Sequence, residues 1–137
     1  MARAFLMSIK PKFGEEILSG FKRYELRRVA AGLIEPGDVV YLYFTRPIAA
    51  VVGWFEAGVV YIAPPANLRE VAAALGDIGL GDEDWRYVEG AKYAMLIEVK
   101  RRARCGRPLP LGELGLRAPP SYARLRPAAA RELARLC

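Results

Sequence analysis

A cluster of charged side chains lies in the stretch 20–28, where acid and base alternate closely. Lys22 follows a glycine by two positions, and Glu25 and Arg27 stand two residues apart, so on a strand the latter two share one face. A lysine ammonium is a compact charge, and an arginine guanidinium is a planar fork of donors. These groups suit phosphate oxygens and base edges, and a carboxylate accepts from an exocyclic amine. The stretch predicts a site that can hold one nucleotide.

A structural interpretation of the same residues stays open. In that interpretation Glu25 pairs with Arg27 or Lys22 and fastens a turn to the sheet, and the chain is a structural or partner-binding domain. Exposed pairs of this kind contribute only about 0–1 kcal/mol. The ligand-binding interpretation instead expects Lys22→Ala and Arg27→Ala to weaken binding without lowering the melting temperature.

The elements that position this stretch are mostly strands. Apolar residues at helical spacing predict helices, and runs of β-branched and aromatic residues predict strands. Gly20 is expected to end a helix in the left-handed conformation, Asp82 to cap a short one, and Gly53 and Gly58 to bend a long strand. Predicted helices cover about 11–19, 68–75, 82–87 and 127–136; predicted strands cover about 3–9, 23–28, 39–45, 48–62 and 93–102, with a turn at 35–38 and one short strand within a winding segment at 103–126. Because helices interrupt the strands without alternating with them, we expect an α+β fold built on a small mixed barrel.

Size and charge bound the class of protein. The 137 residues are 53% hydrophobic, which predicts one globular domain over residues 1–137. The net charge is +6, and residues 100–137 hold ten Lys and Arg against two Asp and Glu. Clustered positive charge favours a polyanionic partner. The alternative is an arginine-rich thermophile or GC-rich host, since the chain has one asparagine and no glutamine.

Several chemistries are excluded or made improbable by composition. The chain has no histidine, so we expect no histidine-based catalysis, no metal site and no cofactor. No run approaches the roughly 20 apolar residues of a membrane span, and no signal peptide is recognisable. We therefore expect a cytoplasmic protein, favour a monomer, and interpret Cys105 and Cys137 as two unrelated thiols, with a bridge between them left open.

The densest basic run begins at Lys100. On a strand Lys100, Arg102 and Arg104 would line one face at about 6.6–6.8 Å per pair, close to the phosphate spacing of a nucleic-acid strand. The alternative is a solvated strand end. Among the aromatic residues, Tyr24 and Trp54 are the candidates for stacking on a base, while the other aromatics are expected in the core.

The stretch 20–28 resembles a known signature. Gly20, Lys22, Glu25 and Arg27 match the G-x-K-x-x-E-x-R motif of the ASCH family, and the surrounding segments follow in the family's order over about residues 6–125. The resemblance implies a PUA-like mixed barrel of about 5–7 strands with 3–4 short helices, followed here by the helix at 127–136. It also implies a cleft between barrel and helix, proposed to bind RNA, into which Lys22, Glu25 and Arg27 point.

The resemblance also implies roles for neighbouring residues. Gly20 would be the backbone pivot that turns Lys22 inward, and we expect Lys10 and Lys12 to add to the rim of the cleft, because they flank the same helix. The partner implied is RNA or a nucleotide, in RNA metabolism or translation-linked regulation. We expect a binding domain rather than an enzyme.

Enzymatic alternatives come from the same resemblance. One ASCH branch removes acyl groups from nucleosides such as N4-acetylcytidine with a Lys, a Thr and a Glu. Lys22 matches the first, but Glu25 occupies the position of the threonine, and a catalytic pair here would be Lys22 and Glu25. Thr45 is the chain's one threonine and is expected to be structural; Glu56 and Glu98 are candidates for the remaining acid. A ribonuclease, the other alternative, would have to rely on Lys, Glu or Tyr.

Overall fold

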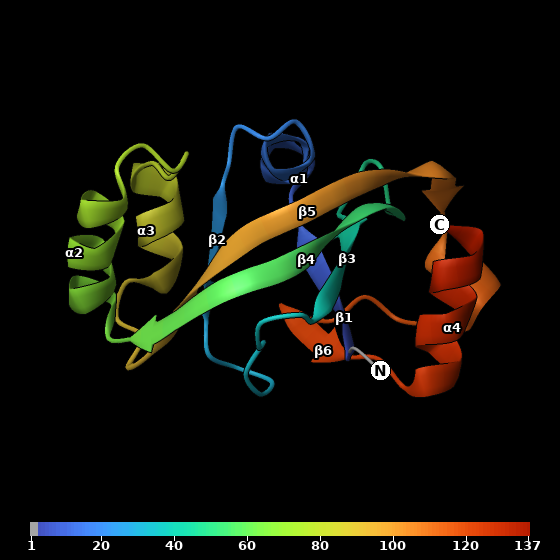
Figure 1. Ribbon diagram of the computed structural model, residues 1–137. Helices are drawn as coiled ribbons and strands as arrows, with labels where there is room; N and C mark the ends of the chain where they lie inside the picture. Colours follow the sequence, from blue (N-terminus) through green and yellow to red (C-terminus); the bar gives the residue numbers. More distant parts are fainter. Residues whose placement is uncertain (1–2) are drawn as a thin grey trace.

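The computed structural model describes residues 3–137, and within that range the α+β prediction is confirmed. Six strands and four α-helices form one curled half-barrel with helices at its ends and over one opening (Figure 1). In chain order the elements are β1 (Ala4–Ile9), α1 (Pro11–Leu18), β2 (Tyr24–Arg28), β3 (Val39–Phe44), β4 (Ala50–Ala63), α2 (Pro65–Leu75), α3 (Asp82–Val88), β5 (Ala94–Leu109), a 3₁₀ turn (Leu111–Leu114), β6 (Tyr122–Arg124) and α4 (Pro127–Leu136).

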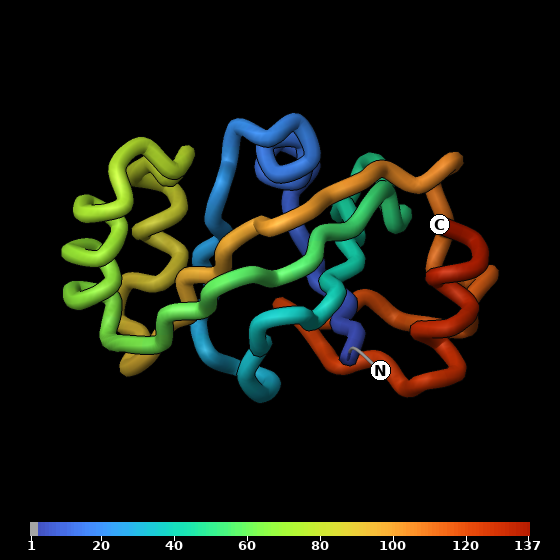
Figure 2. Tube along the Cα trace, viewed as in Figure 1, coloured from blue at the N-terminus to red at the C-terminus, as the bar shows by residue number. Residues whose placement is uncertain are grey.

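The strands form one sheet in the order β2-β5-β4-β3-β1-β6. The pair β1 and β3 is parallel, and the other neighbouring strands are antiparallel. The long strands β4 and β5 run side by side along the length of the molecule (Figure 2), and β2 and β6 are the two edge strands of the sheet. Helices α2 and α3 cover the β2 end, α1 lies over the middle, and α4 closes the other end.

Two glycines allow β4 to bend around its partner, as predicted. A Cβ on Gly53 would lie 2.6 Å from the carbonyl oxygen of Ala103, and one on Gly58 would lie 2.1 Å from the carboxylate of Glu98. The register between β4 and β5 shifts near both positions. Shifts of this kind increase twist, and here they curl the sheet instead of leaving it flat.

Three groups of buried apolar side chains follow from this curl. The central group lies between α1 and the inner face of the sheet and includes Ile17, Phe44 and Phe55. A second group packs α2 and α3 against β2 and β5, and a third lies under α4. Between α1, α3 and the strand ends, residues at the border of these groups enclose a cavity.

Two element boundaries differ by three residues or more from those predicted. Strand β5 continues to Leu109, not to residue 102, because residues up to Leu109 still pair with β4 through Gly53 and Val51. Helix α2 begins at Pro65 instead of 68, since a proline in the first turn needs no N–H partner. The turn at 35–38 is confirmed: the Asp38 N–H donates to the Glu35 carbonyl at 3.0 Å.

The interpretation of the two cysteines as unrelated thiols is wrong. Cys105 in β5 and Cys137 after α4 form a disulfide with Cα atoms 4.3 Å apart. The sequence did not predict this pairing, because the late part of β5 was expected to belong to a winding segment. The bond ties α4 to the end of the long strand, where both sulfurs join the apolar group under that helix.

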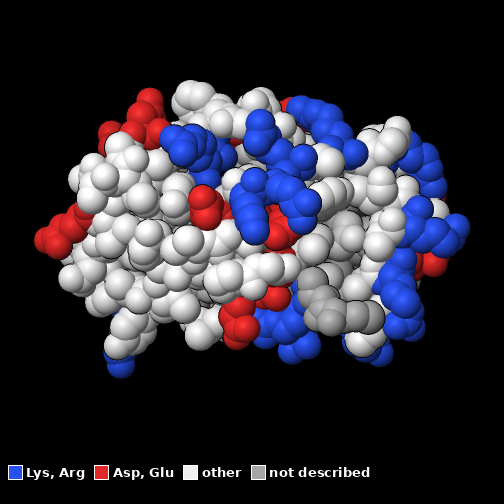
Figure 3. Space-filling view, in the orientation of Figure 1, with Lys and Arg blue, Asp and Glu red and all other residues white. Residues whose placement is uncertain are grey.

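No helix among residues 3–137 is long and apolar enough to cross a membrane. Basic side chains gather over the middle of β4 and β5 and at the α4 end of one face, with acidic side chains among them (Figure 3).

Candidate functional site

A cavity of about 370 Å³ opens where α1, α3 and the ends of several strands meet. Lys22, Glu25 and Arg27, the residues singled out by the sequence, all line it. Its walls come from six parts of the chain: the end of β1, α1, the strand β2 with its flanks, the end of β3, α3, and the segment before β6. The cluster predicted from one local stretch therefore lies in a hollow built by long-range contacts.

Lys22 is almost fully buried and sits between two carboxylates. Its Nζ atom is 3.0 Å from Oε1 of Glu25 and 2.5 Å from Oδ1 of Asp84. The same ammonium lies 4.7 Å from the centre of the Phe13 ring, within range of a cation–π contact. A lysine is rarely buried unless it is paired, and here both partners are buried as well.

Glu25 joins this lysine to Arg27. Its Oε2 accepts a hydrogen bond from Nε of Arg27 at 2.8 Å. Its Oε1, in contrast, is close to Lys22 but out of line for a hydrogen bond, and none of the described residues 3–137 donates one to it. A buried carboxylate oxygen without a donor is costly. The Glu25 carboxylate is therefore held between two cations in the wall of the cavity.

Arg27 fixes the opposite wall. Its Nη2 donates to the Ser8 carbonyl at 2.9 Å, and its Nη1 lies 3.3 Å from Oγ of Ser121. The guanidinium thus links β2 to the end of β1 and to the segment before β6. Its donors are used inside the protein, so its role in this structure is to hold the cavity walls together.

Asp84 is the site residue that the sequence analysis missed. It lies in α3, where Oδ2 accepts from the Gly81 N–H at 2.9 Å and Oδ1 pairs with Lys22. The sequence placed the cap of this helix at Asp82, but Gly81 is the N-cap and Asp82 is the first helical residue. An acid three residues after a glycine is a helix-start signal, although nothing in the sequence connects it to Lys22.

Lys22 and Glu25 each stabilise the charged form of the other. Burial would lower the pKa of Lys22, but the carboxylates of Glu25 and Asp84 outweigh it and raise that pKa above its ordinary value. Burial would likewise raise the pKa of Glu25, but Lys22 and Arg27 outweigh it and lower that pKa. Both groups are therefore ionised at neutral pH, and Lys22 is a fixed positive charge, not a base.

Gly20 supports the site from outside the cavity. Its φ of 87° is left-handed, as predicted, and a Cβ there would lie 2.3 Å from Nη2 of Arg102. The Arg102 side chain donates through Nε to the Leu18 carbonyl at 3.3 Å. The glycine therefore lets the chain turn sharply after α1 and lets Arg102 satisfy that helix end.

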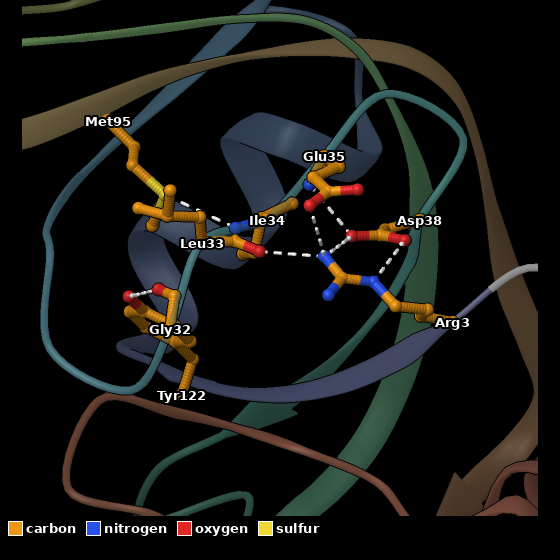
Figure 4. Close-up of polar contacts among 8 residues, drawn as sticks. All are labelled: Arg3, Gly32, Leu33, Ile34, Glu35, Asp38, Met95 and Tyr122. Atoms are coloured by element: carbon orange, nitrogen blue, oxygen red, sulfur yellow. Dashed lines mark hydrogen bonds and ion pairs between the residues drawn. The ribbon is translucent and has the colours of Figure 1, made fainter.

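The loop after β2 forms a further wall, and several polar contacts fasten it (Figure 4). The Tyr122 hydroxyl accepts from the Ala30 N–H at 3.0 Å and donates to the Gly32 carbonyl at 2.6 Å. Arg3 donates to the Leu33 carbonyl at 2.7 Å and to both carboxylate oxygens of Asp38. Ala30 is thereby held at the exposed edge of the cavity.

The two lysines expected at the rim occupy different places. Lys10 lines the cavity, is exposed, and lies 5.4 Å from the centre of the Tyr87 ring. Lys12 does not line it; its Nζ is 3.7 Å from Glu83 and faces a separate hollow. Thr45, expected to be structural, lines the cavity at the end of β3.

The other candidate acids and aromatic residues lie elsewhere. Glu56 pairs with Arg101, and Glu98 accepts from the Val59 N–H, so neither acid lines the cavity. Tyr24 packs against α2 and α3, and Trp54 packs in the group under α4. The aromatic rings of the cavity are instead Phe13 and Tyr87, whose planes meet edge to face.

The basic run of β5 is divided among three partners. Lys100 lies 3.8 Å from Glu56 in a stretch where the strand register shifts. Arg102 bonds to the end of α1, and Arg104 pairs with Glu15 of the same helix. The charges of Lys100 and Arg104 therefore already face carboxylates within the protein.

The structure is similar to solved ASCH structures. The ASCH protein of Zymomonas mobilis superposes with a TM-score of 0.81 at 24% identity, covering 97% of this chain and 94% of that one. A single-residue variant of the same protein gives 0.82, with 97% of each chain covered. The chain has the ASCH fold. The N-terminal domain of Staphylothermus marinus McrB is a more distant match, with a TM-score of 0.60, 8% identity, and 96% and 93% covered. No protein-family model and no curated protein sequence matches this chain.

Within this ASCH fold, the stretch 20–28 supplies one half of the charged network and α3 supplies the other. The local turn at Gly20 and the strand alternation of Glu25 and Arg27 aim the first half inward. The packing of α3 on β2 delivers Asp84 to Lys22. The arrangement is a concave, partly apolar cavity with a buried network of two cations and two carboxylates in its wall.

Proposed function

We propose that this chain is an RNA-binding domain that takes one base into the cavity beside Glu25. The observation that carries the proposal is the buried carboxylate of Glu25, which lines the cavity and whose Oε1, ion-paired with Lys22 at 3.0 Å, accepts no hydrogen bond of good geometry from residues 3–137. A cavity of about 370 Å³ is in the size range of small-ligand sites, roughly 300–1,000 Å³. The exocyclic amine of cytosine, adenine or guanine is the complementary donor.

The balance of charge favours a base over a phosphate at the floor. Lys22 and Arg27 are matched there by Glu25 and Asp84, so the four side chains sum to zero formal charge. A phosphate would meet two carboxylates at close range, whereas a neutral base would not. The exposed ammonium of Lys10 at the edge is the better position for a phosphate.

The apolar walls suit the rest of a base. Ile9, Phe13 and Tyr87 line the cavity, and Tyr87 is half exposed. Aromatic faces stack on bases with little sequence preference, contributing about 1–3 kcal/mol each. Walls of this kind would hold the ring system, and Glu25 would read its edge.

Closing the cavity tests the proposal with little disturbance of the fold. Ala30→Trp places a large ring at an exposed position of the wall, and its side chain replaces no hydrogen bond. The matched control is Ala66→Trp, exposed on α2 and outside the cavity. Fluorescence anisotropy with labelled octamers of cytidine, adenosine and uridine should show tighter binding of the amine-bearing bases by the wild type, and a loss of at least tenfold in Ala30→Trp only.

Two outcomes would overturn the proposal. One is that no octamer binds beyond the salt-sensitive background of a protein with net charge +6. The other is that the Ala30→Trp and Ala66→Trp variants both bind the octamers as tightly as the wild type does.

A second candidate function is deacylation of an acylated nucleoside, which is favoured by the position of Thr45 in the same cavity as Lys22 and Glu25. Lys22 is held protonated, and a developing oxyanion would have to compete with Glu25 and Asp84 for its ammonium. Turnover of N4-acetylcytidine that Thr45→Val abolishes would support this function. Absence of turnover at high enzyme concentration, with binding of the same nucleoside intact, would leave the binding function as the better account.

A further inference from the structure

A second hollow adjoins the cavity and carries the features of a platform for single-stranded nucleic acid. It has a volume of about 300 Å³ and is lined by residues at the end of β2 and by the loop between α3 and β5. We call it the Tyr93 groove; it is formed by Arg28, Val29, Gly90, Ala91, Lys92 and Tyr93. Arg28 lines both the groove and the cavity, so the two hollows share one wall.

The aromatic ring of the groove is available for stacking. Tyr93 is 48% exposed, although its backbone is fixed at the start of β5, where its carbonyl accepts from the Val29 N–H at 3.2 Å. The ammonium of Lys92 lies 6.0 Å from the centre of the ring. A half-exposed tyrosine on a fixed backbone presents a flat surface with little loss of conformational entropy on binding.

The positive charges of the groove have no acidic partners within the described chain. Arg28 donates to the carbonyls of Tyr87 and Glu89, at 2.8 and 2.6 Å, which fixes the guanidinium without neutralising it. Neither Arg28 nor Lys92 takes part in an ion pair among residues 3–137. This is unlike β5, where Lys100 and Arg104 both face carboxylates.

We propose that the Tyr93 groove binds the nucleotide adjacent to the one in the cavity, with its base stacked on Tyr93 and its phosphate between Arg28 and Lys92. The proposal rests on the function proposed above and makes the ligand a single-stranded RNA of at least two nucleotides. A positive groove with an aromatic platform is the combination that single-strand binders use. The shared wall at Arg28 gives the chain a continuous path from one hollow to the next.

The test compares short and long probes on variants of the groove. The probes are the 5′-monophosphates and the fluorescein-labelled tetranucleotides of cytidine and adenosine, titrated against the full chain. Tyr93→Ala should weaken tetranucleotide binding about five- to a hundredfold and leave monophosphate binding within twofold. Tyr93→Phe keeps the ring and should bind as the wild type does.

Two further variants test the charge of the groove and the specificity of its aromatic ring. Lys92→Ala should reduce the slope of log affinity against log salt by about 0.7 for the tetranucleotide, as expected for one lost phosphate contact. Phe21→Ala removes a ring that is 62% exposed but lies outside the groove, and it should change nothing.

The outcomes separate the two proposals. Equal tetranucleotide affinity in the wild type and Tyr93→Ala, with binding still lost in Ala30→Trp, overturns the groove and leaves the cavity proposal standing. Wild-type chain that binds neither monophosphate nor tetranucleotide overturns both. An effect of Tyr93→Ala on an acidic peptide but not on RNA would assign the groove to a protein partner and also overturn the proposal.

Discussion

Asp84 of α3 places a carboxylate oxygen 2.5 Å from the ammonium of Lys22, and the same carboxylate accepts the first free N–H of its own helix. One side chain thus begins a helix and completes the buried charge network of the cavity. Because one carboxylate performs both tasks, the position of α3 and the charge state of Lys22 depend on each other.

Asp84→Asn should therefore destabilise the chain more than the loss of a helix cap alone does. The change removes a buried charge beside Lys22 and weakens the contact to Gly81, and we expect a loss of about 2–4 kcal/mol in the free energy of unfolding, measured in urea. Asp82→Asn, exposed in the first turn of the same helix, is the matched control and should lose no more than about 0.5 kcal/mol. Equal losses in the two variants would contradict the dual role.

Lys22→Met should be among the most damaging single changes in the chain. It keeps most of the side-chain volume but leaves Glu25 and Asp84 buried without their shared cation, which costs about 3–5 kcal/mol. This differs from the expectation drawn from the sequence, that removal of Lys22 spares stability, because that expectation took the side chain to be accessible. A melting temperature unchanged from the wild type would show that the lysine is not buried as described.

Stability should vary little with pH over a wide range. Glu25 has a lowered pKa, so its contribution is complete above its ordinary value of 4.5 and is lost as the pH falls through the lowered value. Lys22 has a raised pKa, so its contribution is complete below its ordinary value of 10.5 and is lost as the pH rises through the raised value. With no histidine, we expect a nearly constant melting temperature from about pH 5.5 to 9.5. A step near pH 6–7 in calorimetry would contradict this assignment.

Gly20→Ala should lower the free energy of unfolding by more than an alanine at another left-handed position does. The φ of 87° is unfavourable for alanine by about 1–2 kcal/mol, and the new Cβ would also displace Arg102 from the end of α1. Gly115→Ala, at φ 64° with open space around the Cβ position, measures the backbone part by itself. We expect Gly20→Ala to lose about 1 kcal/mol more than Gly115→Ala; the reverse order would exclude a role for the Arg102 contact.

The disulfide should stabilise the fold without affecting the cavity. A bridge across 32 residues contributes about 3–4 kcal/mol by restricting the unfolded chain. Reductant should therefore lower the denaturation midpoint of the wild type but leave a Cys105→Ser/Cys137→Ser double variant unchanged. Neither cysteine lines the cavity, so RNA affinity should be equal with and without reductant under native conditions.

Local patterns were sufficient to predict part of this site. The left-handed turn at Gly20 and the shared face of Glu25 and Arg27 depend on neighbouring residues, and both are present. The burial of Lys22 was not predictable, because it depends on Asp84, a partner delivered by the packing of α3. Thr45 was expected to be structural and the disulfide was only left open, because strand order and the full length of β5 are what bring those residues into place.

The charge balance at the cavity floor has a kinetic consequence. Two positive and two negative groups at close range cancel beyond a few ångströms, so the floor exerts no attraction on a distant polyanion. Arrival of an RNA chain would be governed by the peripheral cations, and ionic strength would slow it. The choice among bases, made at contact distance by one carboxylate oxygen, would be insensitive to salt.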